Sequence, residues 1–210
     1  MYSSNYHSHS IFCDGRSSME DFVRFAISAN LRKFGFSSHA PLPFHTAWSM
    51  NLGDFDDYQR EFKRLKEKYS SQIELFIGLE ADYIEGCTDV YDDFYKNNTF
   101  DYLISSIHYL DRTADNNYWS IDGPFNEFVK GLNELHSGDI FAGVYRFFDV
   151  SNQMIEKGGF DIVGHVDKIM MHALKYPEFS ITNTKYVSLV HQTLENIARK
   201  GLLLEINTKS

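Results

Sequence analysis

Short β-rich runs alternate with amphipathic helical segments along most of this chain. Apolar runs typical of strands cover residues 6–12, 33–37, 73–79, 102–107, 160–163 and 202–206. Parallel strands need a long crossover between them, which is usually a helix. The alternation therefore predicts an α/β fold built on a parallel sheet, either doubly wound or closed into a barrel.

The segments between these runs carry helical signals. Ser18 can cap a first helix, with Asp21 three residues on. Apolar residues recur at steps of three and four over residues 55–69, which indicates a surface helix packed on a core. Two more helices are expected within residues 137–158 and 184–200, ending at Gly158 and Gly201, because glycine readily takes the left-handed stop conformation.

Composition limits the class of protein. A chain of 210 residues predicts a single domain over residues 1–210. The net charge of -9 argues against nucleic-acid and anionic-membrane partners. Cys13 and Cys87 form no disulfide framework or Cys-x-x-Cys pair, and no apolar run reaches the roughly 18 residues of a membrane helix. A cytoplasmic protein is expected.

Potential metal ligands fall at the ends of five consecutive predicted strands. Because the carboxyl ends of parallel strands meet at one edge, these side chains are expected to converge there. The residues, in strand order, are His7 and His9 followed by Asp14; His39; Glu80; His108; and His165. Imidazole and carboxylate ligands suit Zn, Mn or Fe.

A single histidine after a strand is more often a cap or a satisfied polar residue than a ligand, so the ordered series carries the argument. Four histidines lie outside the series. His45 lies in a loop where a substrate role is open, His136 and His172 are expected at helix ends or in loops, and His191 is expected on a helix surface.

Five sequence pieces resemble, in order, those of the polymerase and histidinol phosphatase superfamily, within it the histidinol-phosphatase branch. They are Tyr6-His7-Ser8-His9, Gly35-Phe36-Ser37-Ser38-His39-Ala40-Pro41, Gly78-Leu79-Glu80-Ala81-Asp82-Tyr83, Ser105-Ser106-Ile107-His108-Tyr109 and Asp161-Ile162-Val163-Gly164-His165-Val166-Asp167. These pieces span almost the whole chain.

The resemblance implies a distorted (β/α)7 TIM-like barrel with two or three divalent metal ions. It implies that His7 and His9 hold a first metal and that Glu80 bridges this metal to a second one. By the same resemblance, His108 and His165 hold the second metal, and Asp14 and His39 belong to a third. Asp82, Asp101 and Asp167 are candidates to hydrogen-bond the far nitrogens of the ligating imidazoles.

The chain departs from the family pattern at its end. The family carries an Asp-x-His motif on a last strand, whereas this sequence reaches Ser210 soon after the run at residues 202–206. An incomplete barrel lacking its last strand and helix is therefore expected. An open barrel edge is prone to association, for which a homodimer is the simplest outcome.

The resemblance implies a phosphatase that hydrolyses L-histidinol phosphate in histidine biosynthesis. Glu80, His108 and His165 are the expected catalytic metal ligands, and Arg16, His45 and Lys168 are candidates for binding the small phosphorylated substrate. Two alternatives stay open. One is a related phosphoesterase acting on another phosphomonoester or a nucleotide, and the other is an inactive, metal-binding incomplete barrel.

Overall fold

The computed structural model describes residues 4–207, so the last part of the expected C-terminal loop, residues 208–210, lies outside the described residues. Its contacts divide the chain into two compact units. The first holds described residues 4–81 and 92–104, and the second holds residues 82–91 and described residues from 105 onward. The boundary passes through two strands, β3 (Glu74–Asp82) and β4 (Tyr102–Ser106).

Parallel pairing organises the first unit. The strand order is β1 (Ser4–Asn5), β2 (Lys33–Phe36), β3 and then β4. Asn5 pairs with Phe34, and Phe34 pairs with Leu75, both in parallel register. The expected parallel sheet is therefore present, and the strands of this unit end at the same edge.

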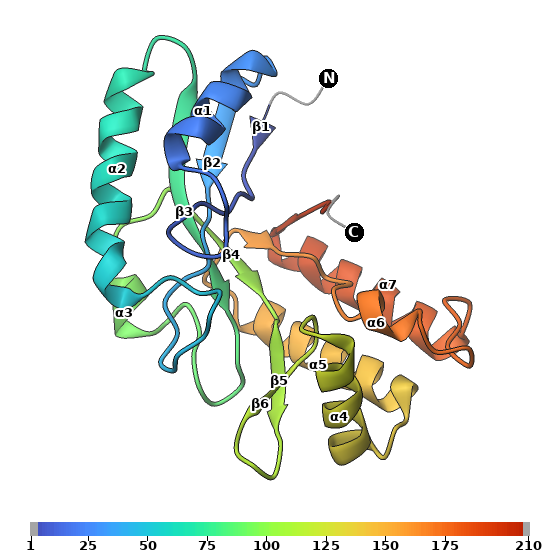
Figure 1. Ribbon diagram of the computed structural model, residues 1–210. Coiled ribbons are helices and arrows are strands. Elements are labelled where there is room, and N and C mark those ends of the chain that lie inside the picture. Colours follow the sequence, from blue (N-terminus) through green and yellow to red (C-terminus); the bar gives the residue numbers. More distant parts are fainter. Residues whose placement is uncertain (1–3, 208–210) are drawn as a thin grey trace. The chain divides into compact units, whose positions relative to one another are not determined.

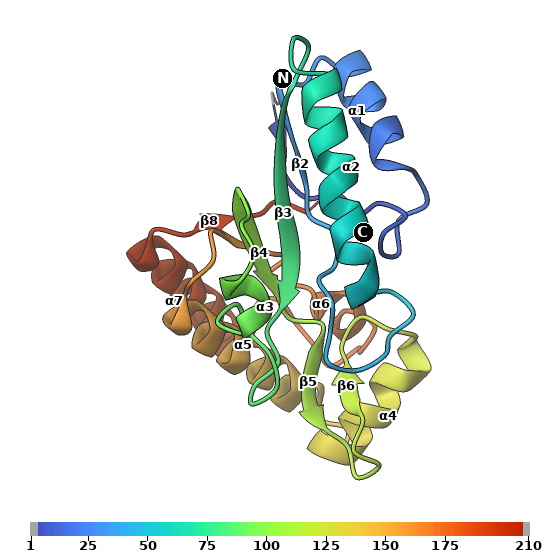
Figure 2. The same ribbon diagram turned by 90° about the vertical axis from the view of Figure 1, so that its left-hand side faces the viewer.

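Two helices pack beside these strands, α1 (Met19–Ser28) and α2 (Phe55–Lys68), as Figures 1 and 2 show. The Ser18 hydroxyl accepts a hydrogen bond from the Asp21 N–H, so the predicted cap is confirmed. The predicted apolar stripe of α2 is buried. Its core residues are Phe55, Tyr58, Phe62 and Leu65. Shorter helical turns in this unit are η1 (Leu52–Asp54) and α3 (Asp93–Lys96).

The Tyr102 side chain crosses the sheet over two glycines. A Cβ built at Gly35 would lie 2.4 Å from the Tyr102 hydroxyl oxygen, and one at Gly78 would lie 2.8 Å from its ring. The hydroxyl donates to the main-chain oxygens of Tyr6, at 2.6 Å, and Phe36, at 3.0 Å. One side chain from β4 thus ties together β2 and the segment that follows β1.

The second unit holds the end of β4 followed by β7 (Ile162–Val163) and β8 (Leu203–Leu204). The Gly164 N–H donates to the Ser105 carbonyl, and Ile162 pairs in parallel with Leu203. Helix α5 (Ile140–Lys157) packs on α7 (Thr184–Lys200), and α6 (Met170–Ala173) is a short turn.

Two features of the second unit were not expected from the sequence. One is an antiparallel hairpin formed by β5 (Tyr109–Arg112) and β6 (Tyr118–Ser120). The other is helix α4 (Phe125–His136), which packs on β6. Figure 2 shows α4 beside the hairpin. Ser137 has a left-handed backbone and ends α4, so the helix predicted from residue 137 begins only at Ile140.

The predicted strand over residues 6–12 was wrong. The first strand is limited to Ser4–Asn5, and the chain then leaves the ladder. Beyond it, serine hydroxyls replace part of the main-chain pairing: the Ser8 N–H donates to Ser37 Oγ, and Ser8 Oγ donates to the Gly35 carbonyl. Side-chain hydrogen bonds of this kind compete with a regular ladder. Strand β3 is longer than expected and includes Glu80 and Asp82.

Candidate metal centre

Main-chain pairing places His39 and Glu80 side by side in the first unit. The two residues form a parallel bridge just beyond β2, in which the Glu80 N–H donates to the Ser38 carbonyl and the Ala40 N–H donates to the Glu80 carbonyl. Both side chains are buried, and that of Glu80 is only 1% exposed. A carboxylate buried to this degree requires cationic or hydrogen-bonding partners.

His7 and His9 reach the same place although they lie outside a strand. Ser8 between them is held against β2 by its hydrogen bonds, including one from the Ser37 N–H to the Ser8 carbonyl. The two imidazole rings stack with centroids 5.0 Å apart, and their Nε2 atoms are 2.9 Å apart. The expected side-by-side arrangement of the His-x-His pair is therefore present.

Three imidazole nitrogens converge on a single oxygen of Glu80. His7 Nε2, His9 Nε2 and His39 Nδ1 lie 3.2, 3.1 and 3.0 Å from Glu80 Oε2. Ligands of a tetrahedral zinc ion with Zn–N bonds of about 2.0–2.1 Å are roughly 3.3 Å from one another. The spacing and the chemistry of this donor set therefore fit a divalent metal ion.

Asp14 joins the cluster from a tight loop. Its Oδ1 lies 2.9 Å from His9 Nδ1 and 3.9 Å from His39 Nε2. The loop folds back so closely that a Cβ at Gly15 would lie 2.0 Å from the His9 carbonyl oxygen. Only glycine permits this approach, which places Asp14 beside His9.

Electrostatics strengthens the pairing of His9 with Asp14. Burial lowers the pKa of His9, but hydrogen bonds to Asp14 and Glu80 outweigh it and raise this pKa to about 12. Burial in turn raises the pKa of Asp14, but the hydrogen bond from His9 and the charge of His39 hold it well below its usual range. The first unit thus concentrates ionisable ligand atoms in two overlapping groups, His7–His9–Glu80 and His9–Asp14–His39.

The second unit holds the other two expected ligands. The rings of His108 and His165 have centroids 4.9 Å apart, and both residues are buried. His108 Nδ1 lies 2.7 Å from Asp82 Oδ1, which confirms Asp82 as a partner of a candidate ligand. Of the other two aspartates considered for this role, Asp101 accepts from the Ile77 N–H, and Asp167 is exposed with no side-chain hydrogen bond to another described residue.

Glu205 was not expected from the sequence to lie beside a candidate ligand. Its carboxylate Oε2 accepts a hydrogen bond from the His165 N–H at 3.0 Å, and the Glu205 N–H donates to the Val163 carbonyl. The signal was available, since Glu205 follows a strand run in the same way as the other candidates.

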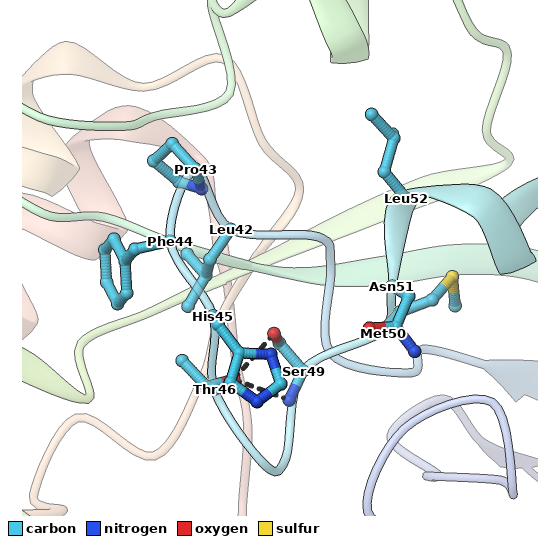
Figure 3. A pocket seen from close by; sticks show the side chains of 9 residues that line it. All are labelled: Leu42, Pro43, Phe44, His45, Thr46, Ser49, Met50, Asn51 and Leu52. Carbon is cyan, nitrogen blue, oxygen red and sulfur yellow. Dashed lines mark hydrogen bonds between the residues drawn. The ribbon is translucent and has the colours of Figure 1, made fainter.

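The candidate substrate residues differ in their surroundings. Arg16 is exposed in the loop that carries Asp14 and has no ion pair among residues 4–207. Lys168 pairs with Asp122, with Nζ and Oδ2 3.4 Å apart. His45 is exposed and lines a cavity of about 250 Å³ formed by residues 42–46 and 49–52 (Figure 3).

The loop around this cavity is fastened to the first unit's ligand cluster. The Met50 N–H donates to the His39 carbonyl, and the Trp48 and His39 rings meet edge to face with centroids 4.5 Å apart. Thr46 Oγ1 donates to Ser49 Oγ at 2.7 Å and accepts from the Ser49 N–H, which closes the turn drawn in Figure 3.

The remaining histidines fit their expected places. His136 ends α4, His172 lies in the short turn α6, and His191 is exposed on α7. His172 is nevertheless buried, with Nε2 2.8 Å from the Gly123 carbonyl oxygen.

Residues 5–209 of this chain match the family model of the PHP domain. The "Probable histidinol-phosphatase" of Deinococcus radiodurans is 26% identical over 207 residues, covering 96% of this chain and 72% of the relative. A crystal structure from Listeria monocytogenes, assigned as a histidinol phosphatase, has a TM-score of 0.83 at 23% identity and covers 98% of this chain and 82% of its own.

A second solved structure is the histidinol phosphate phosphatase of Lactococcus lactis, complexed with zinc, L-histidinol and phosphate. It gives a TM-score of 0.73 at 23% identity, over 99% of this chain and 73% of its own. These matches confirm the expected α/β fold, and it is consistent with part of a TIM-like barrel. No helix within residues 4–207 is long and apolar enough to cross a membrane.

Proposed function

The chain belongs to the PHP domain family, and from this membership we propose that it is a metal-dependent phosphatase that hydrolyses L-histidinol phosphate to L-histidinol and phosphate. The observation that carries the proposal is the convergence of His7, His9 and His39 on Glu80 Oε2. The named relatives and the ligands of the Lactococcus lactis enzyme support this substrate. The reaction would serve histidine biosynthesis in the cytoplasm.

The proposed metal ligands follow the family pattern residue by residue. By that pattern His7, His9 and Glu80 would hold a first divalent ion, Glu80, His108 and His165 would hold a second, and Asp14 and His39 would serve a third. Ions bound there would supply an activated water and would neutralise the charge of a phosphate group. Zinc, manganese and iron all suit imidazole and carboxylate ligands.

The chain's own side chains orient the substrate. We assign Arg16 and Lys168 to the phosphate, because a guanidinium or an ammonium group neutralises its oxygens. Arg16 is the stronger candidate, since it is exposed beside Asp14 whereas Lys168 already pairs with Asp122. We assign His45 to the leaving alcohol, and the hydrogen bond from the Met50 N–H to the His39 carbonyl, which connects its loop to a proposed ligand, supports this assignment.

The test measures phosphate release from L-histidinol phosphate by the chain loaded with Mn²⁺ or Zn²⁺. Glu80→Gln keeps the shape of the side chain and removes its charge. We expect it to lower kcat/KM by more than the roughly 10–100-fold that loss of an outer partner costs. Glu74→Gln is the matched control, because Glu74 lies on the same strand but is exposed and forms an exposed ion pair with Lys33. Equal rates for the wild type and Glu80→Gln contradict the proposal.

A panel of phosphomonoesters and nucleotides tests the substrate. If another phosphomonoester were hydrolysed faster than L-histidinol phosphate, the proposed metal-dependent mechanism would stand and only the proposed substrate would be wrong. Bound metal without turnover of any of these compounds would instead favour an inactive metal-binding domain.

A homodimer through the edge of β8 is the proposed assembly. Leu203 and Leu204 are 63% and 41% exposed on this strand, and Ile206 beyond it is 84% exposed. Within the described part of the second unit, β8 pairs only with β7. An apolar strand edge of this kind favours pairing with another chain. Light scattering of the wild type and Leu203→Lys tests it, since the lysine should give a monomer.

A further inference from the structure

Asp82 and His108 form a deeply buried carboxylate–imidazole pair in the second unit. We propose that Asp82 is a positioning residue that fixes the tautomer of His108 and so leaves Nε2 as the atom that binds metal. This inference rests on the proposed function, because it takes His108 to be a metal ligand.

The geometry of the pair carries the inference. His108 Nδ1 and Asp82 Oδ1 are 2.7 Å apart, and the two side chains are 5% and 0% exposed. An ionised carboxylate can only accept, so the hydrogen lies on Nδ1. The lone pair of the neutral ring is then on Nε2, the nitrogen that faces away from Asp82.

Main-chain contacts hold Asp82 in place. The next residue, Tyr83, donates its N–H to the carbonyl of Ser106, two residues before His108, at 2.9 Å. Asp82 Oδ2 is buried and has no hydrogen-bond donor among residues 4–207. Within the described chain, the hydrogen bonding of this carboxylate is therefore directed at the His108 ring.

His172 supplies a contrast within the same unit. It is also buried, but its Nε2 lies 2.8 Å from the Gly123 carbonyl oxygen, so the hydrogen lies on Nε2. Lys175 Nζ lies 3.2 Å from the opposite nitrogen, Nδ1, and can donate to it. The two buried histidines therefore carry opposite tautomers, and His172 is a built-in reference for a measurement on His108.

Nitrogen-15 NMR of histidine-labelled protein tests the assignment directly. In the metal-free wild type, at a pH where the NMR shifts show both rings to be neutral, His108 should show the Nδ1–H tautomer and His172 the Nε2–H tautomer. In the zinc-loaded protein, His108 should keep its Nδ1–H and bind zinc through Nε2. An Nε2–H tautomer for His108 in the metal-free wild type overturns the proposal without any variant being needed.

Asp82→Asn tests the consequence for metal binding. An amide can either accept a hydrogen bond from Nδ1 or donate one to it, so the variant no longer selects one tautomer of His108. His108 should then populate both neutral tautomers, whereas the tautomer of His172 should be unchanged. Zinc affinity measured by competition with a chelator should fall about 10–100-fold. Asp149→Asn is the control, because it breaks an exposed ion pair with Arg146 in the same unit and should leave zinc affinity unchanged.

The outcomes separate this inference from the proposed function. Neither the NMR signals nor the zinc affinity requires turnover, so an inactive wild type with the expected tautomers refutes only the phosphatase. Equal zinc affinity of Asp82→Asn and Asp149→Asn, with phosphatase activity intact, refutes only the role of Asp82.

Discussion

The Tyr102 hydroxyl donates a 2.6 Å hydrogen bond to the carbonyl of Tyr6, a residue 96 positions earlier in the chain. Tyr6 directly precedes His7, so this bond fixes the backbone at the start of the ligand cluster. The same hydroxyl lies 3.0 Å from the Phe36 carbonyl oxygen, close to the start of the segment that leads to His39. Two ligand-bearing segments therefore depend on one buried phenol.

Tyr102→Phe is expected to lower the free energy of unfolding by about 1–3 kcal/mol, because two main-chain carbonyls lose a buried donor. It should also weaken zinc binding, since His7 follows Tyr6. Denaturant unfolding and a zinc competition assay measure the two effects. Tyr145→Phe serves as the control, because its hydroxyl makes a long 3.4 Å contact with Asn183 in the second unit of the chain. Unchanged zinc affinity in Tyr102→Phe would contradict the link to His7.

Gly15→Ala is expected to disrupt the Asp14 loop. The added Cβ would meet the His9 carbonyl carbon and oxygen at 2.4 and 2.0 Å, and backbone atoms cannot yield as a flexible side chain can. Metal content per chain, measured by elemental analysis, should fall. Gly53→Ala is the matched variant, because nothing lies within 4 Å of the Cβ it adds. Full metal content in Gly15→Ala would show that the close approach does not matter.

Removing metal with a chelator is expected to lower the melting temperature. Buried imidazoles around Glu80 gain stability from a bound ion, and a ligand at about 100 times its Kd contributes about 2.7 kcal/mol. For a chain of this size, that corresponds to roughly 5–10 °C. Scanning calorimetry before and after addition of excess Zn²⁺ checks the effect, and an identical melting temperature in both would rule out a folded-state metal site.

Glu20→Gln is expected to reduce the loss of folding free energy that occurs when the pH is lowered. Hydrogen bonds from Lys68, Arg64 and Tyr69 hold the pKa of Glu20 well below its ordinary value of 4.5. A depressed carboxyl pKa adds stability above the unfolded pKa, and this stability is lost as the pH falls below about 4.5. Unfolding measured between neutral pH and acid should show a smaller drop in the variant. If the free energy of unfolding fell equally with pH in the wild type and in Glu20→Gln, the hydrogen bonds of Glu20 would contribute nothing to stability.

The sequence predicted much of the first unit because strand order alone determines which residues meet at a parallel edge. His39 and Glu80 are adjacent for that reason, and their bridge needed no knowledge of loops. His7 and His9 lie side by side as expected, although they do not belong to a strand. The serine between them hydrogen-bonds to β2, which places the two imidazoles together without a strand.

Other features could not be predicted because they depend on contacts distant in sequence. The hairpin strands β5 and β6 are only 4 and 3 residues long, too short for a period-2 pattern to be distinguished from chance. The pairing of Lys168 with Asp122 likewise needs the fold to bring two loops together. The tyrosine that crosses the sheet leaves no local pattern in the sequence.

The contact of the Tyr102 ring with Gly35 links the residues that these two positions can carry. A Cβ added at Gly35 would lie 2.4 Å from the phenol oxygen, so a larger residue there requires a smaller side chain at position 102. A smaller ring gives no such relief at Gly78, because the main-chain oxygen of Tyr102 would lie 2.5 Å from a Cβ added there. A library randomised at positions 35 and 102 together should therefore yield folded combinations that single changes do not reach.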